Sequence, residues 1–259
     1  MDKDFSNLYE FAFRGTPEGY SNMIEYLAGI AEKELWDFGG EEKNYILKKY
    51  IFGTFRQCYN QNKILYTPDN EACCFNTGLL TQNGDDILAF FLKNQKPDSQ
   101  PWFFKGFKEK SDRDIMRLFT EIPQLATYTD NYEEFYFNPN YEILTNTDHI
   151  LDDNWERIQS AIPLSKNVVK TLLIGVVEEA KMKIRRNLRL VVPQFYDNKI
   201  MYLVPLRIPV DDDNYVTMAL AVEKTSSDRY RANTIFTKET AYEKARLLMK
   251  PESNWLIEK

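Results

Sequence analysis

Hydrophobic residues recur at helical spacing in two stretches near the N-terminus. In SNMIEYLAGIAEKELW (Ser21–Trp36), apolar side chains return every three or four positions, and Ser21 occupies the place of an N-cap. After the glycine-containing break DFGGEE, the segment EEKNYILKKYIFGTFRQCYNQ repeats the pattern up to Gln61. Both stretches predict helices that bury one face.

Shorter apolar runs, bounded by turn residues, come next. KILY and ACCFNTG flank the turn TPDNE and predict a hairpin. ILAFFLKN and PWFFKGF have the length of strands, and the Asn83–Gly84 pair before them favours a tight turn. A helix is expected near DRDIMRLFTEI, before a loop rich in tyrosine and acidic residues.

The C-terminal half opens with the clearest helix pattern, SKNVVKTLLIGVVEEAKMKIRRN, with Ser165 as its N-cap. Strand signals follow in KIMYLVPLRIPV, YVTMALAVEK and RYRANTIFT, and Thr237 caps a last helix, KETAYEKARLLMK.

We therefore predict an α+β fold: N-terminal helices with short antiparallel strands, then a long helix, an antiparallel sheet and a closing C-terminal helix. The chain is expected to form a single domain that can divide into two lobes. These would be an N-terminal α+β lobe (1–145) and a C-terminal helix–sheet–helix lobe (146–259).

Composition limits the class of protein. Hydrophobic residues make up 43% of the 259 residues, which is enough to bury a core. No apolar stretch approaches the ~20 residues of a membrane span, and no signal-peptide pattern is found. An odd number of cysteines, Cys58, Cys73 and Cys74, predicts reduced thiols in the cytoplasm. We expect no metal and no cofactor.

A basic run contrasts with the formal net charge of −6, and any contact with nucleic acid must therefore be local. It comprises Lys181, Lys183, Arg185, Arg186 and Arg189. One interpretation is that these cations neutralise the negative end of the long helix. The other is that they bind phosphates, while Phe195 and Tyr196 stack on bases.

The segment HILDDNWERI contains the only histidine of the chain. On a helix, His149, Asp153 and Arg157 would lie along one slanting stripe. They form either an exposed ladder of ion pairs or a phosphate site, in which a protonated imidazole and a guanidinium bind a phosphodiester.

Two further groups are candidates for a site. Asn76 and Thr77, next to Gly78, either contact a ligand or form a plain turn. Tyr230 and Thr234 lie four positions apart on a predicted strand, which places them on the same face, and Arg246 follows on the last helix.

These residues allow a metal-independent ribonuclease. His149 would be the base, Arg157 or Arg246 would stabilise the charge of the phosphate, and Tyr230 would act as the acid. Nothing in the sequence shows that these residues meet.

Several ordered phrases between about Leu27 and Leu256 carry a family resemblance. They are ACCFNTGLLT, PWFFKGF, HILDDNWERI, VVPQFYDNKIMYLVPL, ALAVEK and YRANTIFTKETAYEKARLLMKPESNWL. Together they resemble the domain-of-unknown-function 3825 family. Its members are fused to RNA-binding modules of the cold-shock and LOTUS types, which implies an RNA-related setting by association.

The leading functional hypothesis is an intracellular RNA- or nucleotide-binding module, with the basic run and HILDDNWERI near one cleft. The metal-independent ribonuclease using His149 is the first alternative. A protein-interaction domain, with Trp155, Phe195 and Trp255 as contact anchors, is the second.

Overall fold

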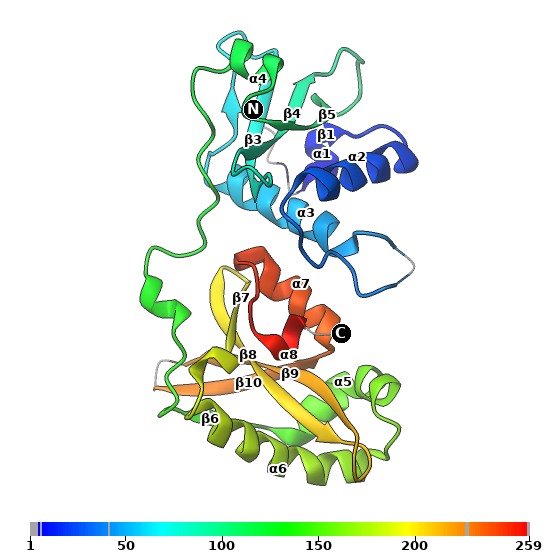
Figure 1. The fold of residues 1–259 in the computed structure, drawn as a ribbon, viewed down its shortest axis with the longest axis vertical. Helices are drawn as coiled ribbons and strands as arrows, with labels where there is room; N and C mark the ends of the chain where they lie inside the picture. The colour runs from blue at the N-terminus through cyan, green and yellow to red at the C-terminus, as the bar shows by residue number, and fades with distance from the viewer. Residues whose placement is uncertain (1–4, 6, 41, 226–227, 258–259) are drawn as a thin grey trace. The chain divides into compact units, whose positions relative to one another are not determined.

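The computed structural model describes residues 5, 7–40, 42–225 and 228–257. The chain divides into two compact units, Met1–Thr127 and Tyr128–Lys259 (Figure 1). Residues 128–145, which the sequence assigned to the N-terminal lobe, pack within the C-terminal unit. There the backbone N–H of Asn138 donates to the hydroxyl of Tyr230 at 2.8 Å.

The N-terminal unit is built on a five-stranded sheet with the order β1-β5-β4-β3-β2. Its elements are α1 (Leu8–Phe11), β1 (Ala12–Phe13), α2 (Pro17–Ile30), α3 (Tyr45–Asn60), β2 (Leu65–Tyr66), β3 (Ala72–Leu80), β4 (Asp86–Lys93), β5 (Trp102–Glu109) and α4 (Arg113–Leu118). The predicted antiparallel strands are confirmed, and β1 adds a parallel edge against β5 that the sequence did not predict.

Strands β3 and β4 are buried along most of their length because helices cover both faces of the sheet. On one face, the ring of Phe55 from α3 lies 5.7 Å from that of Phe75. On the other face, Ile115 of α4 packs with Cys74 and Phe90. This two-sided burial explains why these strands read as continuous apolar runs.

Helix α2 begins four residues before the predicted N-cap and ends six residues before the predicted end. Thr16 caps it instead of Ser21, because its Oγ1 accepts the N–H of Gly19 at 3.1 Å. The helix stops at Ile30 because the next residues join the sheet: Ala31 forms a bridge with Thr81.

The C-terminal unit contains a second five-stranded sheet, with the order β6-β10-β9-β8-β7. Its elements are η1 (Tyr132–Phe135), β6 (Glu142–Leu144), α5 (Thr147–Ala161), α6 (Lys166–Ile184), η2 (Leu188–Leu190), β7 (Val192–Tyr196), β8 (Lys199–Pro209), β9 (Tyr215–Lys224), β10 (Arg229–Phe236), α7 (Lys238–Leu248) and α8 (Asn254–Ile257). The α+β class is confirmed, but both sheets are mixed, since β1 runs parallel to β5 in the first sheet and β6 runs parallel to β10 in the second.

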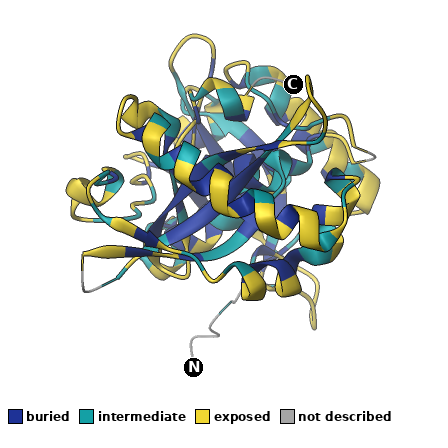
Figure 2. Cartoon of the chain, turned by 90° about the horizontal axis from the view of Figure 1, so that it is seen from below, coloured by how far each residue is buried: buried dark blue, intermediate teal, exposed yellow. Residues whose placement is uncertain are grey.

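Helices α5 and α6 cover one face of this sheet, and α7 lies against the other (Figure 1). Seen from below, α6 turns exposed positions to the viewer and buried ones to the sheet behind (Figure 2). Its buried side chains, such as Leu173 and Val177, pack with Leu206 and Leu220. Ser165 occupies the N-cap position of α6, but its side chain makes no capping hydrogen bond.

A β-bulge in β10 corrects one expectation about side-chain direction. The register shifts between Ala232 and Thr234, so that Thr234 pairs with Ala221, whereas Tyr230 pairs with Lys224. One extra residue in a strand reverses the faces of all residues that follow it. Tyr230 therefore faces α6, and Thr234 does not share its face.

Candidate functional site

A groove of about 570 Å³ opens in the C-terminal unit between α6, η2, α8 and the outward face of β8 and β9. We call it the α6–α8 groove. The polar and charged residues and the rings that line it are Glu179, Lys183, Arg207, Tyr215, Thr217, Lys238, Asn254 and Trp255.

The alternation of β8 and β9 places polar groups in this groove. Leu206 and Ile208 point into the core, so the intervening Arg207, paired with Thr217, points to the opposite face. The guanidinium of Arg207 lies 3.6 Å from the ring centroid of Tyr215, a cation–π contact that holds both side chains.

The groove is positively charged in an acidic chain. Among the described lining residues, Lys183, Arg207 and Lys238 face one carboxylate, Glu179, which forms an ion pair with Lys183. Within the described residues, neither Arg207 nor Lys238 forms an ion pair. Lys238 is also the first residue of α7, where the helix dipole repels a cation. Helix stability therefore gives no reason for a lysine at this position.

The aromatic wall of the groove is fixed by hydrogen bonds to the backbone. The indole Nε1–H of Trp255 donates to the carbonyl of Leu190 at 2.7 Å, and Ser253 Oγ donates to the carbonyl of Arg189 at 3.0 Å. These two bonds tie α8 to the segment that carries the basic run. The groove and the basic run are therefore neighbours.

The five cations of the basic run have different surroundings. Lys181 and Lys183 form ion pairs with Glu178 and Glu179, one helical turn away. Arg186 Nη1 donates to the carbonyl of Met182, as expected near a helix C-terminus. Arg185 and Arg189 are exposed, and the side chain of neither has a polar partner in the described part of the chain. Contacts within α6 therefore account for three of the five cations.

His149 lies away from this region. It is exposed, and its Nε2 lies 3.3 Å from Asp153 Oδ2. The adjacent Asp148 pairs with Lys170 of α6. Arg185 follows Lys170 by fifteen residues, which is about 22 Å along a helix. The structure does not bring His149 and the basic run into one cleft.

Arg157 fixes α5 to the sheet. Its Nη1 donates to Asn154 Oδ1 at 3.0 Å and to the carbonyl of Ile235 at 2.6 Å. Thr234 Oγ1 donates to the same Asn154 oxygen at 2.6 Å. Strand β6 pairs only with the first half of β10, so Arg157 binds a carbonyl on the unpaired edge of the second half. Arg157 and Thr234 therefore lie close together, and their shared hydrogen-bond partner Asn154 makes this contact part of the packing of α5 on the sheet.

The remaining ribonuclease candidates are buried. Tyr230 stacks on Phe137 with ring centroids 4.2 Å apart, and burial raises the pKa of its hydroxyl. Arg246 is only 7% exposed, on α7, which covers the face of the sheet opposite Tyr230. Neither residue lines the α6–α8 groove.

Phe195 and Tyr196 end strand β7. Phe195 packs edge-on against Tyr128, with ring centroids 5.0 Å apart, and is partly buried. Tyr196 is exposed, with Lys244 Nζ 5.7 Å from its ring centroid. Only Tyr196 offers an open ring face for stacking, and it does not line the groove.

Asn76 and Thr77 belong to the N-terminal unit and lie inside β3. Asn76 Nδ2 donates to Asp86, and Thr77 Oγ1 donates to the carbonyl of Ile87 at 2.6 Å. Both are buried in a β-bulge where Gly78 adopts φ = +73°. Their side chains form hydrogen bonds with β4 at the bulge and do not face a ligand.

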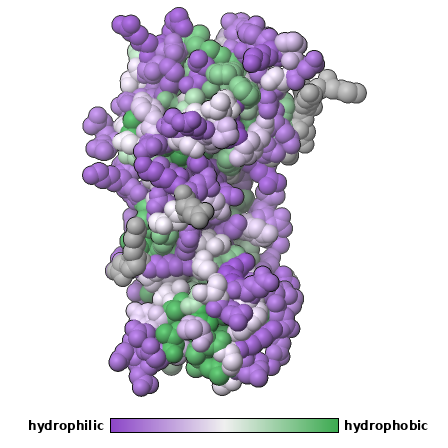
Figure 3. Space-filling model, turned by 90° about the vertical axis from the view of Figure 1, so that its right-hand side faces the viewer, coloured by the Kyte–Doolittle hydropathy of each residue, from purple (hydrophilic) through white to green (hydrophobic). Residues whose placement is uncertain are grey.

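The anchors expected of a protein-interaction surface are only partly exposed. Trp155 and Phe195 pack against the core, and Trp255 is bound to Leu190. Hydrophobic side chains do gather on one face of the C-terminal unit, in the lower part of Figure 3. Helix α6 also leaves Val168 and Ile174 exposed.

The described residues offer few other kinds of site. Nowhere among them do three His, Cys, Asp or Glu side chains group as a metal site requires. All three cysteines are free and buried. No single helix in the described ranges is long and apolar enough to cross a bilayer. The pair α5 and α6 meets that test only together, across a 98° bend.

The sequence did not identify Arg207, Tyr215 and Lys238 as site residues. Arg207 is a charged residue at an outward position of an otherwise apolar strand, and this signal was available. Its contact with Tyr215 depends on the register across a five-residue turn, which the sequence alone leaves undetermined. The basic run pointed to the correct end of α6.

Comparison with known proteins gives a family and nothing more specific. No curated protein and no solved structure matches the chain. One family model, described as a domain of unknown function (DUF3825), matches residues 27–255, which is nearly the whole chain. The ordered phrases, the two α+β units and this match agree, and the chain belongs to the DUF3825 family.

Proposed function

We propose that the C-terminal unit binds single-stranded RNA, with one nucleotide in the α6–α8 groove and the adjoining phosphates on the basic end of α6. The observation that supports this most is the pair of cations without carboxylate partners, Arg207 and Lys238, beside fixed rings in an acidic protein.

The groove offers both kinds of contact that a nucleotide needs. A guanidinium and an ammonium bind phosphate oxygens by charge-assisted hydrogen bonds. Trp255 and Tyr215 offer ring surface to a base, and Asn254 and Thr217 offer polar groups to a ribose or base edge. Arg185 and Arg189 extend the positive surface past Leu190, so that a strand longer than one nucleotide gains affinity.

Titration of a labelled single-stranded 12-mer RNA, followed by fluorescence anisotropy at several salt concentrations, tests the proposal. If the protein contacts three phosphates of the RNA, the logarithm of the binding constant should fall with the logarithm of the salt concentration with a slope of about −2. The double variant Arg207→Glu, Lys238→Glu should bind roughly tenfold more weakly or worse, because attraction becomes repulsion.

A matched control changes the net charge equally at a distance from the groove. Arg56 and Lys105 are exposed cations of the N-terminal unit that form no ion pair in the described ranges. The variant Arg56→Glu, Lys105→Glu should bind RNA nearly as the parent protein does. Equal losses in both variants, or no binding by the parent at low salt, would refute the proposal.

A ribonuclease activity has less support. His149, Tyr230 and Arg246 do not line the groove, and Tyr230 and Arg246 are buried. On the binding proposal, His149→Ala should leave RNA affinity within about twofold of the parent, because His149 does not line the groove and its neighbour Asp148 pairs with Lys170, near the opposite end of α6 from the basic run. RNA cleavage that disappears in this variant would restore the ribonuclease alternative.

A further inference from the structure

A second cavity lies in the N-terminal unit and is unrelated to the groove. It has a volume of about 940 Å³ and lies where α3 ends, beside β2 and the start of β5. Its wall contains aromatic rings and side-chain amides, so we call it the aromatic–amide pocket. The residues that matter here are Tyr59, Tyr66, Trp102, Asn60, Asn62 and Asn70.

Three aromatic rings line the pocket. Tyr66 and Trp102 contact each other with centroids 5.6 Å apart and planes tilted by 48°. Trp102 is buried, while Tyr66 remains 41% exposed and therefore keeps open ring surface. Tyr59 is held in place by the backbone N–H of Phe5, which donates to its hydroxyl at 3.2 Å.

Three asparagines, Asn60, Asn62 and Asn70, also line the pocket, and their side-chain amides make no hydrogen bond within the described residues. Asn62 and Asn70 both have left-handed backbone, with φ of 54° and 56°. Their backbone N–H groups donate to Tyr59 and Thr67, which fixes the main chain and leaves the amides free to face a ligand.

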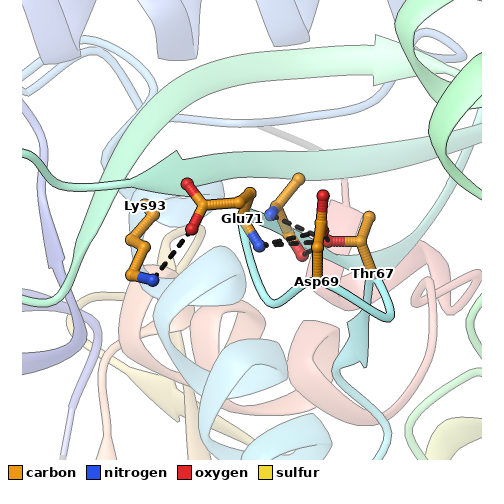
Figure 4. Close-up of polar contacts among 5 residues, drawn as sticks. Thr67, Asp69, Glu71 and Lys93 are labelled. Atoms are coloured by element: carbon orange, nitrogen blue, oxygen red, sulfur yellow. Dashed lines mark hydrogen bonds and ion pairs between the residues drawn. The ribbon is translucent and has the colours of Figure 1, made fainter.

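The turn that carries Asn70 is rigid. Thr67 Oγ1 donates to Asp69 Oδ1 at 2.6 Å and accepts the N–H groups of Glu71 and Ala72 (Figure 4). The N–H of Glu71 also donates to Asp69, and its carboxylate binds Lys93 on β4 at 2.8 Å (Figure 4). The rim of the pocket is therefore organised before any ligand arrives.

The charge of the pocket decides the class of ligand. Among the described residues, no carboxylate lines the pocket, and the one lining cation, Lys93, is paired with Glu71. Such a wall favours an uncharged group over a phosphate or an ammonium ion. A flat, uncharged ring can stack on tyrosine. If its edge carries both donors and acceptors, it can also pair with an asparagine amide, which donates and accepts hydrogen bonds.

We propose that the aromatic–amide pocket binds a nucleobase, stacked on Tyr66 and hydrogen-bonded by Asn62 and Asn70. This site belongs to a different unit from the α6–α8 groove, and it does not depend on the function proposed for that groove. It requires no phosphate, so a nucleoside alone should occupy it.

Isothermal titration of the full chain with adenosine tests this proposal. Tyr66→Ala removes the stacking ring, and Asn70→Gly removes the amide while keeping the left-handed backbone. Each should weaken adenosine binding by roughly tenfold, within the range for loss of a stacked base. AMP should bind no more tightly than adenosine, because the one cation among the described lining residues, Lys93, is already paired with Glu71.

Two controls match these substitutions chemically. Tyr26 is an exposed tyrosine on α2, and Asn198 is an exposed asparagine with φ = 56° in the C-terminal unit. Tyr26→Ala and Asn198→Gly should both bind adenosine like the parent. Arg207→Glu, Lys238→Glu should also bind it normally, even if that variant loses RNA, so the two proposals fail separately.

Three results would overturn the proposal. The first is no saturable binding of adenosine up to about 10 mM, because stacking on Tyr66 together with two amide hydrogen bonds should give a Kd below this concentration. The second is equal binding by the parent, Tyr66→Ala and Asn70→Gly. The third is binding of methyl glucoside in place of adenosine, which would identify the pocket as a carbohydrate site.

Discussion

Replacing Glu223 by Gln should remove a part of the protein's stability that depends on pH. The carboxylate of Glu223, on β9, accepts hydrogen bonds from Lys199 at 2.8 Å, Arg231 at 2.9 Å and Asn233 at 3.3 Å. Its side chain is only 17% exposed. The bulge in β10 contributes to this cluster, because Asn233 is the residue that the register shift displaces.

The magnitude follows from the pKa of this carboxyl group. The hydrogen bond from Lys199, aided by Asn233 and Arg231, lowers the pKa of Glu223 from 4.5 to about 2. A depression of this size corresponds to on the order of 3 kcal/mol of folding free energy. Because the folded-state pKa is the lower one, this stability is present above pH 4.5 and is lost as the pH falls toward 2.

Urea unfolding of the parent and E223Q at pH 7, 5, 4 and 3 measures the effect. The variant should be less stable by about 1–3 kcal/mol at pH 7. The difference should shrink below pH 4.5, because the carboxyl group of the unfolded parent then takes up a proton while that of the folded parent stays ionised. Glu178→Gln is the control, since that carboxylate pairs with Lys181 but is 64% exposed. A difference for E223Q that is the same at pH 7 and pH 3 would refute the reasoning.

Three further results are expected. Gly78→Ala should destabilise the N-terminal unit by more than about 1 kcal/mol in thermal unfolding, because alanine resists positive φ. Its Cβ would also lie 2.7 Å from the Tyr50 hydroxyl; an unchanged melting temperature would contradict this. Arg157→Met should lower the free energy of unfolding by about 1.5–3 kcal/mol, since the carbonyl of Ile235 loses its donor. Faster hydrogen exchange of the β10 amides should accompany this loss of stability. The thiols should react with a disulfide reagent only after unfolding, because burial raises the pKa of Cys58 and Cys74 to about 12 and raises that of Cys73 as well. Rapid labelling of the native protein would count against this expectation.

The parts of the fold that the sequence predicts are those with long, regular patterns. Helices α3 and α6 each bury one face at helical spacing, and strands β8 and β9 are apolar segments of strand length, so the local pattern identifies all four elements. Strands β1 and β6 escape prediction because each has only two or three residues, and their partners lie far along the chain. Local sequence cannot specify a pairing that tertiary contacts select.

The candidate site was predictable only in part. The basic run at the end of α6 is visible as composition, and it adjoins the groove through Lys183. The grouping of Arg207 with Lys238 depends on where β8 and the start of α7 meet, which no local pattern contains. The prediction that Tyr230 and Thr234 share a face assumed a regular strand, and the bulge at Asn233 places them on opposite faces.

Because residues 128–145 pack within the C-terminal unit, they determine where a fragment containing that unit alone must begin. A fragment that starts at residue 146 would discard β6, the parallel neighbour of β10, together with Phe137, whose ring covers Tyr230. Without β6, the first half of β10 would become an exposed edge with unpaired backbone groups, and Tyr230 would lose the ring that covers it. Both changes favour self-association. Expression of the second half should therefore start at Tyr128.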